Sequence, residues 1–293
     1  MELRVLNYFL TVVYEENITS AAEKLHITQP TLSRQLMQLE EELGVSLFRR
    51  GKKKITLTSE GLLLKRRAEE ILDLTSRTEL ELKEQKPLMN GEIVIGGGET
   101  QSMRVLADFI KTFSTEYPQV TYKLYSADAD DIKDRVNKGL LDICLLTEPV
   151  DVDKYDFIRI PQKERWGVIM RKDSPLTQER SVAPEDLLAY PILIPGRALV
   201  QNELDNWFGD AYGAVHIIGR YNLIYNAAIL VEAGVGVALC LEKLVPVSEE
   251  TELCFRTLAP ALETGVVIAW KKNQIFPPAV AKFIELLKNA FRA

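Results

Sequence analysis

Residues 17–50 read NITSAAEKLHITQPTLSRQLMQLEEELGVSLFRR, and the spacing of their apolar and capping residues predicts two short helices joined by a tight turn. Ser20 and Glu23 have the spacing of a capping box, which opens the first helix. Thr28 is a good N-cap for the second helix, and Pro30 is tolerated in its first turn. This arrangement is typical of a helix-turn-helix, whose second helix enters the major groove of DNA.

The exposed face of the second helix is polar and carries one arginine. Its leucines cluster within about 60° on a helical wheel, and Arg34 falls nearly opposite them. An arginine on a helix surface is often simply solvated, but in this motif it is well placed to contact a base edge or a phosphate. The residues predicted to contact DNA from this helix are Thr28, Gln29, Pro30, Thr31, Ser33 and Arg34.

A basic run follows the second helix. It consists of five cations around one glycine, namely Arg49, Arg50, Lys52, Lys53 and Lys54. The next residues, 55–58, alternate like a strand, so the run predicts the tip of a β-hairpin. A charge run is more often a solvated loop, but its position directly after a helix-turn-helix favours contact with the phosphate backbone.

These motifs carry a specific resemblance. Residues 21–35 resemble the DNA-binding core of LysR-type transcription regulators, and residues 39–50 and 56–61 continue the likeness into the wing and linker helix of that family. The likeness covers residues 3–67 nearly without gaps, and a weaker one spans most of the remainder. It implies a sequence-specific regulator of transcription, controlled by a small-molecule effector and assembled as a dimer that is often doubled into a tetramer.

The region after the wing has a heptad pattern. From Glu60 to about Glu84, apolar and small residues recur at alternating steps of four and three. They are Leu64, Ala68, Ile71, Thr75, Thr78 and Leu82. Because a lone helix cannot bury such a narrow stripe, the pattern predicts a linker helix that pairs with a second copy of the chain. Packing against its own domain is the alternative.

Beyond Gly91, strand-like and helix-like segments alternate, which predicts an α/β domain. The resemblance implies the fold of type-2 periplasmic solute-binding proteins, in which two lobes joined by crossover strands hold the effector between them. The expected multidomain organisation is an all-α winged helix-turn-helix (1–59), a linker helix (60–86), a hinge (87–90) and an effector-binding domain (91–293). Within the last domain, lobe I comprises 91–161 and 266–293, and lobe II comprises 162–265.

Candidate effector contacts lie where predicted strands end. Residues 96–102 connect a strand to a helix, where free N–H groups and the helix dipole favour an anion. The family uses hydroxyl groups here, and Thr100 and Ser102 match, whereas Glu99 suits an amine or a zwitterion better than a carboxylate. The candidates are Thr100, Gln101, Ser102 and Thr147 in lobe I, and Pro195, Gly196, Arg197 and Tyr225 in lobe II. For each of them, ordinary turn and capping chemistry is the alternative.

The charge distribution and the cysteine content indicate which classes of protein the chain resembles least. The net charge is −6, but residues 1–67 hold eleven Lys or Arg and eight Asp or Glu, so the N-terminal region alone is basic. Three cysteines at wide spacing predict neither a disulfide framework nor a metal site, and a redox pair of Cys240 and Cys254 is less favoured than buried bystanders. No signal peptide or apolar run of membrane-spanning length is apparent, so a cytoplasmic location is expected.

An enzyme is not expected. The chain has two histidines, His26 and His216, which lie far apart in the sequence, and it has no nucleotide-binding, nucleophile-elbow or zinc-protease motif. No cofactor or metal is predicted. The expected partners are double-stranded DNA, an unidentified small-molecule effector and a second copy of the chain, with no membrane. A stand-alone solute-binding protein would lack the basic N-terminal motif.

Overall fold

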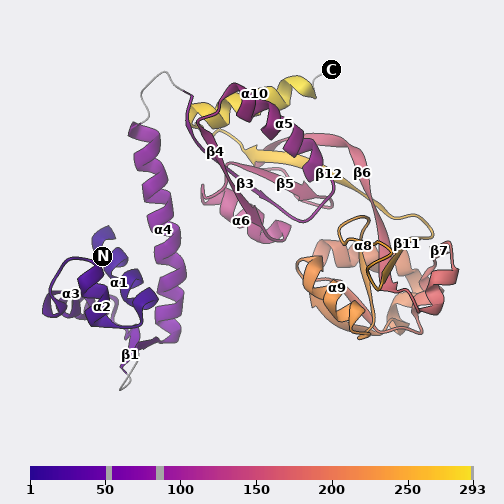
Figure 1. Ribbon diagram of the computed structural model, residues 1–293, viewed down its shortest axis with the longest axis horizontal. Coiled ribbons are helices and arrows are strands. Elements are labelled where there is room, and N and C mark those ends of the chain that lie inside the picture. The colour runs from indigo at the N-terminus through magenta and orange to yellow at the C-terminus, as the bar shows by residue number, and fades with distance from the viewer. Residues whose placement is uncertain (51–54, 84–88, 292–293) are drawn as a thin grey trace. The chain divides into compact units, whose positions relative to one another are not determined.

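The computed structural model describes residues 1–50, 55–83 and 89–291, and it divides into two compact units, Met1–Gln85 and Lys86–Ala293 (Figure 1). The N-terminal unit consists of α1 (Leu3–Glu15), α2 (Ile18–Lys24), α3 (Gln29–Leu43), β1 (Phe48–Arg50), β2 (Ile55–Leu57) and α4 (Ser59–Lys83). Strands β1 and β2 are antiparallel, and Phe48 faces Leu57.

The ends of α2 and α3 follow from local capping. The side chain of Asn17 accepts hydrogen bonds from the backbone N–H groups of Thr19 (2.8 Å) and Ser20 (3.2 Å), so α2 begins before Ser20. The predicted capping box is therefore wrong, because Ser20 already lies inside the helix. Thr28 caps α3 as predicted, and the helix ends at Gly44 in the left-handed conformation (φ 69°).

One apolar core holds the N-terminal unit together. It includes Phe9 of α1, Leu32 and Leu39 of α3, and Ala68 of α4. Leu64 and Ile71 pack against the same core, so the first half of the predicted heptad seam is used inside the unit. The carboxylate of Glu40 accepts hydrogen bonds from the backbone of Leu47 and Phe48, which ties α3 to the wing.

The C-terminal unit is an α/β structure whose strands lie in the order β4-β3-β5-β12-β6-β10-β8-β9, with β11 and β7 joined to the side of β6. Its strands are β3 (Gly91–Gly97), β4 (Val120–Ser126), β5 (Ile143–Thr147), β6 (Tyr155–Arg171), β7 (Ser181–Val182), β8 (Ile192–Pro195), β9 (Ile217–Tyr221), β10 (Val237–Leu241), β11 (Leu253–Leu258) and β12 (Glu263–Lys271). Its helices are α5 (Met103–Glu116), α6 (Ala129–Asn137), α7 (Pro184–Leu187), α8 (Ala198–Phe208), α9 (Ile224–Glu232) and α10 (Pro278–Ala290), with short 3-10 helices at Pro175–Gln178 and Gly209–Ala214.

Two long strands connect the two lobes of this unit. The first half of β6 pairs with β12 beside the parallel strands β3, β4 and β5, whereas its second half pairs with β10 and β11. Each lobe has its own buried core, centred on Ile143 and Phe283 in lobe I and on Val168 and Leu239 in lobe II. The expected lobe boundaries at 161/162 and 265/266 fall inside β6 and β12. Within the described ranges, no helix has the length and apolar character needed to cross a membrane.

The start of α4 offers a test of this packing. A Cβ atom added at Gly61 would overlap the carbonyl oxygen of Leu47, which is backbone and cannot turn away. Alanine favours helices over glycine, so propensity alone predicts stabilisation by Gly61→Ala. We expect the steric clash to prevail and to lower the free energy of unfolding by about 1–3 kcal/mol.

The measurement is urea unfolding followed by circular dichroism. Gly213→Ala is the control, because a Cβ atom at Gly213 meets nothing within 4 Å. An unchanged or higher stability of Gly61→Ala would contradict the described approach of α4 to the wing.

Candidate DNA-binding and effector sites

The N-terminal end of α3 exposes a polar surface. Thr28, Gln29, Pro30, Thr31 and Arg34 are exposed, and Ser33 is half-buried. The hydroxyl groups of Thr28 and Thr31 lie 2.8 Å apart, and the amide of Gln29 donates to Ser33 (2.9 Å). Arg34 has neither an ion pair nor a hydrogen bond within the described part of the chain. Its guanidinium group is therefore available for a ligand from outside.

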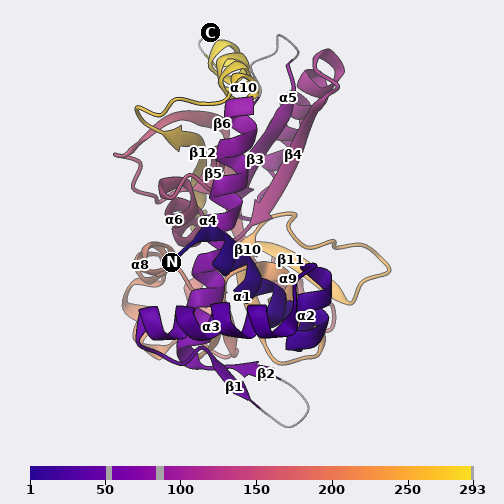
Figure 2. The ribbon, with the colours of Figure 1, turned by 90° about the vertical axis from the view of Figure 1, so that its left-hand side faces the viewer.

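The wing lies beside this helix. Figure 2 shows the β1–β2 hairpin running below α3 in the N-terminal unit. Arg49 is exposed and faces Thr56 across the hairpin. Arg50 ends β1, while Lys52, Lys53 and Lys54 lie outside the described residues. Arg49 therefore lies on a wing strand that runs beside α3.

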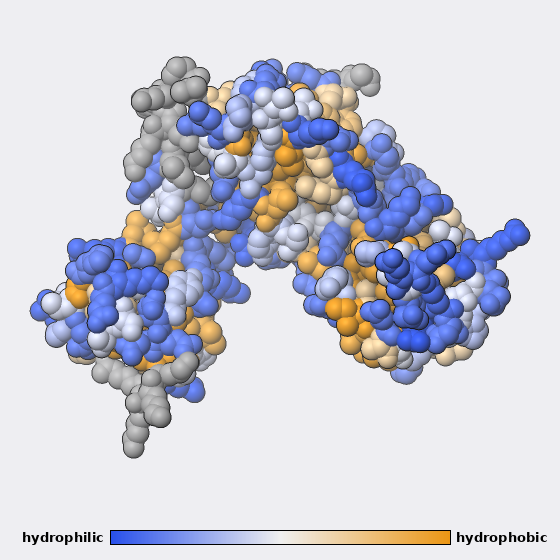
Figure 3. Space-filling view, viewed as in Figure 1, coloured by the Kyte–Doolittle hydropathy of each residue, from blue (hydrophilic) through white to orange (hydrophobic). Residues whose placement is uncertain are grey.

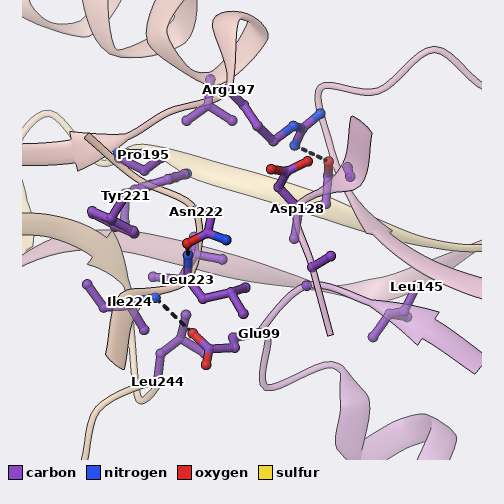
Figure 4. A pocket seen from close by; sticks show the side chains of 17 residues that line it. Glu99, Asp128, Leu145, Pro195, Arg197, Tyr221, Asn222, Leu223, Ile224 and Leu244 are labelled. Carbon is purple, nitrogen blue, oxygen red and sulfur yellow. Dashed lines mark hydrogen bonds between the residues drawn. The ribbon is translucent and has the colours of Figure 1, made fainter. Parts of the chain in front are cut away.

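A cleft lies between the two lobes of the C-terminal unit (Figure 4). Apolar residues make up most of its wall. Thr147, Pro195 and Arg197 of the predicted set line it, and they come from the carboxyl ends of β5 and β8 and from the start of α8. Strand ends at one edge of an α/β sheet commonly form such sites.

Arg197 bridges the lobes. Its guanidinium group donates to the carbonyl oxygens of Thr147 (3.3 Å) and Pro149 (2.9 Å). Burial lowers the pKa of Arg197, while the nearby carboxylates of Asp130 and Asp128 oppose that shift. Asp128 lies in the opposite lobe and faces Arg197 across the cleft in Figure 4.

Glu99 forms a second bridge. Its carboxylate accepts a hydrogen bond from the backbone N–H of Ile224 (2.9 Å), the first residue of α9, as Figure 4 shows. A carboxylate at the positive end of a helix is stabilised by the helix dipole. The amide of Gln101 adds a third contact, to the carbonyl oxygen of Lys243 (2.6 Å).

Thr100 and Ser102 do not line the cleft. Both are buried, and their hydroxyl groups donate to the carboxylate of Glu164 in β6. Gly196 is also absent from the wall, and its backbone N–H donates to the carbonyl oxygen of Tyr221 (2.8 Å). Tyr225 is 68% exposed and lies outside the wall. The structure therefore brings together only part of the predicted set.

Other wall residues were not predicted from the sequence, including Asp128, Trp166 and Tyr221. Asp128 had a readable signal, because aspartate is a preferred N-cap residue. Its carboxylate accepts hydrogen bonds from the backbone N–H groups of Asp130 and Asp131 in α6. Tyr221 ends β9, and its hydroxyl donates to the carbonyl oxygen of Leu239. Burial raises the pKa of Tyr221 well above its usual value, so this phenol is neutral at pH 7.

Comparisons with known proteins match both units. Residues 3–62 match the bacterial regulatory helix-turn-helix proteins of the lysR family, and residues 87–292 match the LysR substrate binding domain. The chain belongs to the LysR family. It is therefore a DNA-binding transcription regulator with an effector-binding domain, and not an enzyme. The predicted family, fold class and general function are confirmed.

Relatives are similar along the whole chain. The HTH-type transcriptional regulator BsdA of Bacillus subtilis (strain 168) is 27% identical over 98% of this chain and 100% of its own length. The uncharacterized regulator YcgK of the same organism is 30% identical over 100% of this chain and 95% of its own length. The crystal structure of full-length CbnR complexed with its target DNA shares the fold, with a TM-score of 0.75, 22% identity and coverage of 99% and 100%.

The cysteines of this LysR-family chain lie in two environments. Cys144 and Cys240 are buried, whereas Cys254 is only partly buried, and all three are free thiols. Burial raises the pKa of Cys144 to about 12 and raises that of Cys240 as well. Since the thiolate is the reactive form, both groups are inert at neutral pH. Among the described residues, no cluster of metal-ligating side chains is present.

Thiol labelling tests this difference. At pH 8 a disulfide reagent should react quickly with Cys254 alone. Cys144 and Cys240 should react only after unfolding, because burial raises the pKa of both thiols and keeps them protonated at that pH. In Cys254→Ser the fast reaction should vanish. Oxidation of the native chain to an internal disulfide would instead support the redox pair.

Proposed function

We propose that this LysR-family regulator reads its operator with the first turns of α3 and contacts the phosphate backbone with the basic wing. The observation that carries the proposal is the division of α3 into two faces. Leu32, Leu36 and Leu39 are buried, while Arg34 is exposed and unpaired within the described residues. The proposed contacts are those predicted from the sequence, namely Thr28, Gln29, Pro30, Thr31, Ser33, Arg34, Arg49, Arg50, Lys52, Lys53 and Lys54.

Two variants separate base reading from phosphate contact. Arg34→Ala should remove specific binding while leaving the fold intact, because Arg34 has no partner among the described residues of its unit. Changing Lys52, Lys53 and Lys54 together to Ala should weaken binding to all DNA alike and flatten the slope of log K against log salt by about 0.9 for each phosphate that is no longer neutralised.

Binding to operator and to random duplexes, each measured over a range of salt, checks both expectations. Arg66→Ala is the matched control, since Arg66 is an exposed arginine on α4. Operator affinity unchanged in Arg34→Ala would contradict the base-reading role. A reduction confined to the operator in the triple lysine variant would contradict the phosphate role.

The same regulator is proposed to act as a homo-oligomer in the cytoplasm. Part of the heptad stripe of α4 packs inside its own unit, so pairing through α4 would use the exposed Leu62, Leu63 and Leu74 instead. Lobe II offers a second apolar surface over α9, formed by Tyr225, Ile229 and Leu230 (Figure 3). Two separate exposed apolar surfaces on one chain support a dimer that associates further.

The interlobe cleft is the proposed effector site. It supports this role because its wall is largely apolar and is drawn from both lobes, so a bound molecule changes how the lobes pack. The bridges from Glu99 and Arg197 cross the same space. An effector that rearranges either bridge would couple its binding to the arrangement of the lobes and hence to DNA.

Filling the cleft tests this role. A thermal-shift screen of small metabolites identifies compounds that stabilise the chain and alter operator binding. Leu223→Trp places a large side chain in the cleft wall and should abolish both responses while retaining operator binding without ligand. Leu199→Trp is the matched control, because Leu199 is exposed on α8 and lies outside the wall. Responses that survive in Leu223→Trp would place the effector elsewhere.

A further inference from the structure

Three hydrogen-bond donors converge on a single buried carboxylate at the start of α5. Oε1 of Glu164 accepts from the backbone N–H of Ser102 (2.7 Å), from the hydroxyl of Ser102 (2.6 Å) and from the hydroxyl of Thr100. Ser102 is the N-cap residue of the 14-residue helix α5. Glu164 is 5% exposed, and no cation forms an ion pair with it in the described part of the chain.

This arrangement is the chemistry of an anion site. Hydroxyl groups and a backbone N–H at the positive end of a helix are the donors that proteins use for carboxylate or phosphate ligands. A buried carboxylate without a cation is tolerated only when such donors satisfy it. These donors are present here, but the carboxylate of Glu164 occupies the position that the carboxylate of a ligand would take.

Glu164 does more than satisfy the start of α5, because it lies in a strand that joins the two lobes. Glu164 lies in the crossover strand β6, opposite Thr264 of the other crossover strand, β12. Two residues further along β6, Trp166 lines the cleft. The contact therefore links the first helix of lobe I to the strand that joins the lobes.

We propose that Glu164 is a built-in occupant of a carboxylate site at the start of α5, and that it excludes a carboxylate group of an effector from Thr100 and Ser102. For the cleft effector, the inference rests on the proposed function. The charged groups left facing such an effector are then Glu99, Asp128 and Arg197. The assignment of the carboxylate site stands on its own geometry and can be tested without knowing the effector.

The test is chemical rescue of Glu164→Ala by acetate. Alanine lacks the terminal part of the glutamate side chain, and acetate has the same heavy atoms as that part. Full-length wild-type and variant chains are titrated with sodium acetate against sodium chloride at constant ionic strength, and thermal unfolding is followed. We expect Glu164→Ala to bind acetate saturably, with a rise in Tm of about 3–6 °C at about ten times Kd, while the wild type shows no saturable rise.

Two controls assign the rescue to this site. Acetamide should not replace acetate, because the site stabilises a negative charge. A triple variant with Thr100→Val, Ser102→Ala and Glu164→Ala should bind acetate at least about tenfold more weakly, because two donors to the charged ligand are gone. If Glu164→Ala is unfolded in chloride, the same titration is read as acetate-dependent recovery of the circular dichroism signal.

Equal responses of Glu164→Ala and the wild type to acetate would overturn the assignment, and so would rescue that persists in full in the triple variant. Failure of the acetate rescue would not contradict the proposed effector site in the cleft, since the Leu223→Trp experiment tests that site independently. Conversely, acetate rescue of Glu164→Ala together with an effector that still acts on Leu223→Trp would support the carboxylate site and contradict the cleft as the effector site.

Discussion

The buried leucine stripe of α3 is the constraint on which DNA recognition in this chain depends. Leu32, Leu36 and Leu39 share one buried core with residues of α1, α2, α4 and the wing, so packing fixes the orientation of α3. That orientation leaves the opposite face, with Arg34, outside. The capping bond from Thr28 then determines where the helix begins and which residues occupy its first turns. Packing and capping together expose the proposed reading surface without any contact from Arg34 itself.

The effector domain follows a different principle, in which polar contacts cross an apolar cleft. Each lobe has its own core, and the long strands β6 and β12 join the two. Glu99 connects the opposite lobes through one hydrogen bond and Arg197 through two, and both residues line the cleft. A ligand that supplies new partners can replace such contacts without leaving the side chains of Glu99 and Arg197 unpaired. On this proposal, the core of each lobe stays intact while the two lobes change their arrangement.

Sequence reasoning succeeded where the signal is local or periodic. The Thr28 cap, the stop at Gly44 and the α/β alternation each depend on neighbouring residues, and the structure has all three. The Asn17 cap was missed because two overlapping capping patterns compete within four residues, and spacing alone cannot rank them. Leu64, Ala68 and Ile71 of the predicted heptad stripe pack in the N-terminal core, because periodicity can locate an apolar stripe but cannot name the partner that buries it.

The candidate site was harder to predict, because its residues come from distant parts of the sequence. Thr147, Pro195 and Arg197 lie at strand ends, which the sheet brings to one edge, and the structure places them in the cleft wall. Thr100 and Ser102 bind Glu164 instead, a residue more than sixty positions away on a strand with no motif of its own. Contacts between distant residues become visible only when the fold is known.

The central claim is that this chain recognises DNA by sequence, and selection of bound duplexes from a random pool tests it most directly. The full-length chain is incubated with the pool at low and at moderate salt, and the recovered duplexes are sequenced. We expect a partly palindromic motif that persists at moderate salt, because base contacts are far less dependent on salt than phosphate contacts. Recovery of unrelated sequences only, with binding that disappears as the salt concentration rises, would contradict the claim.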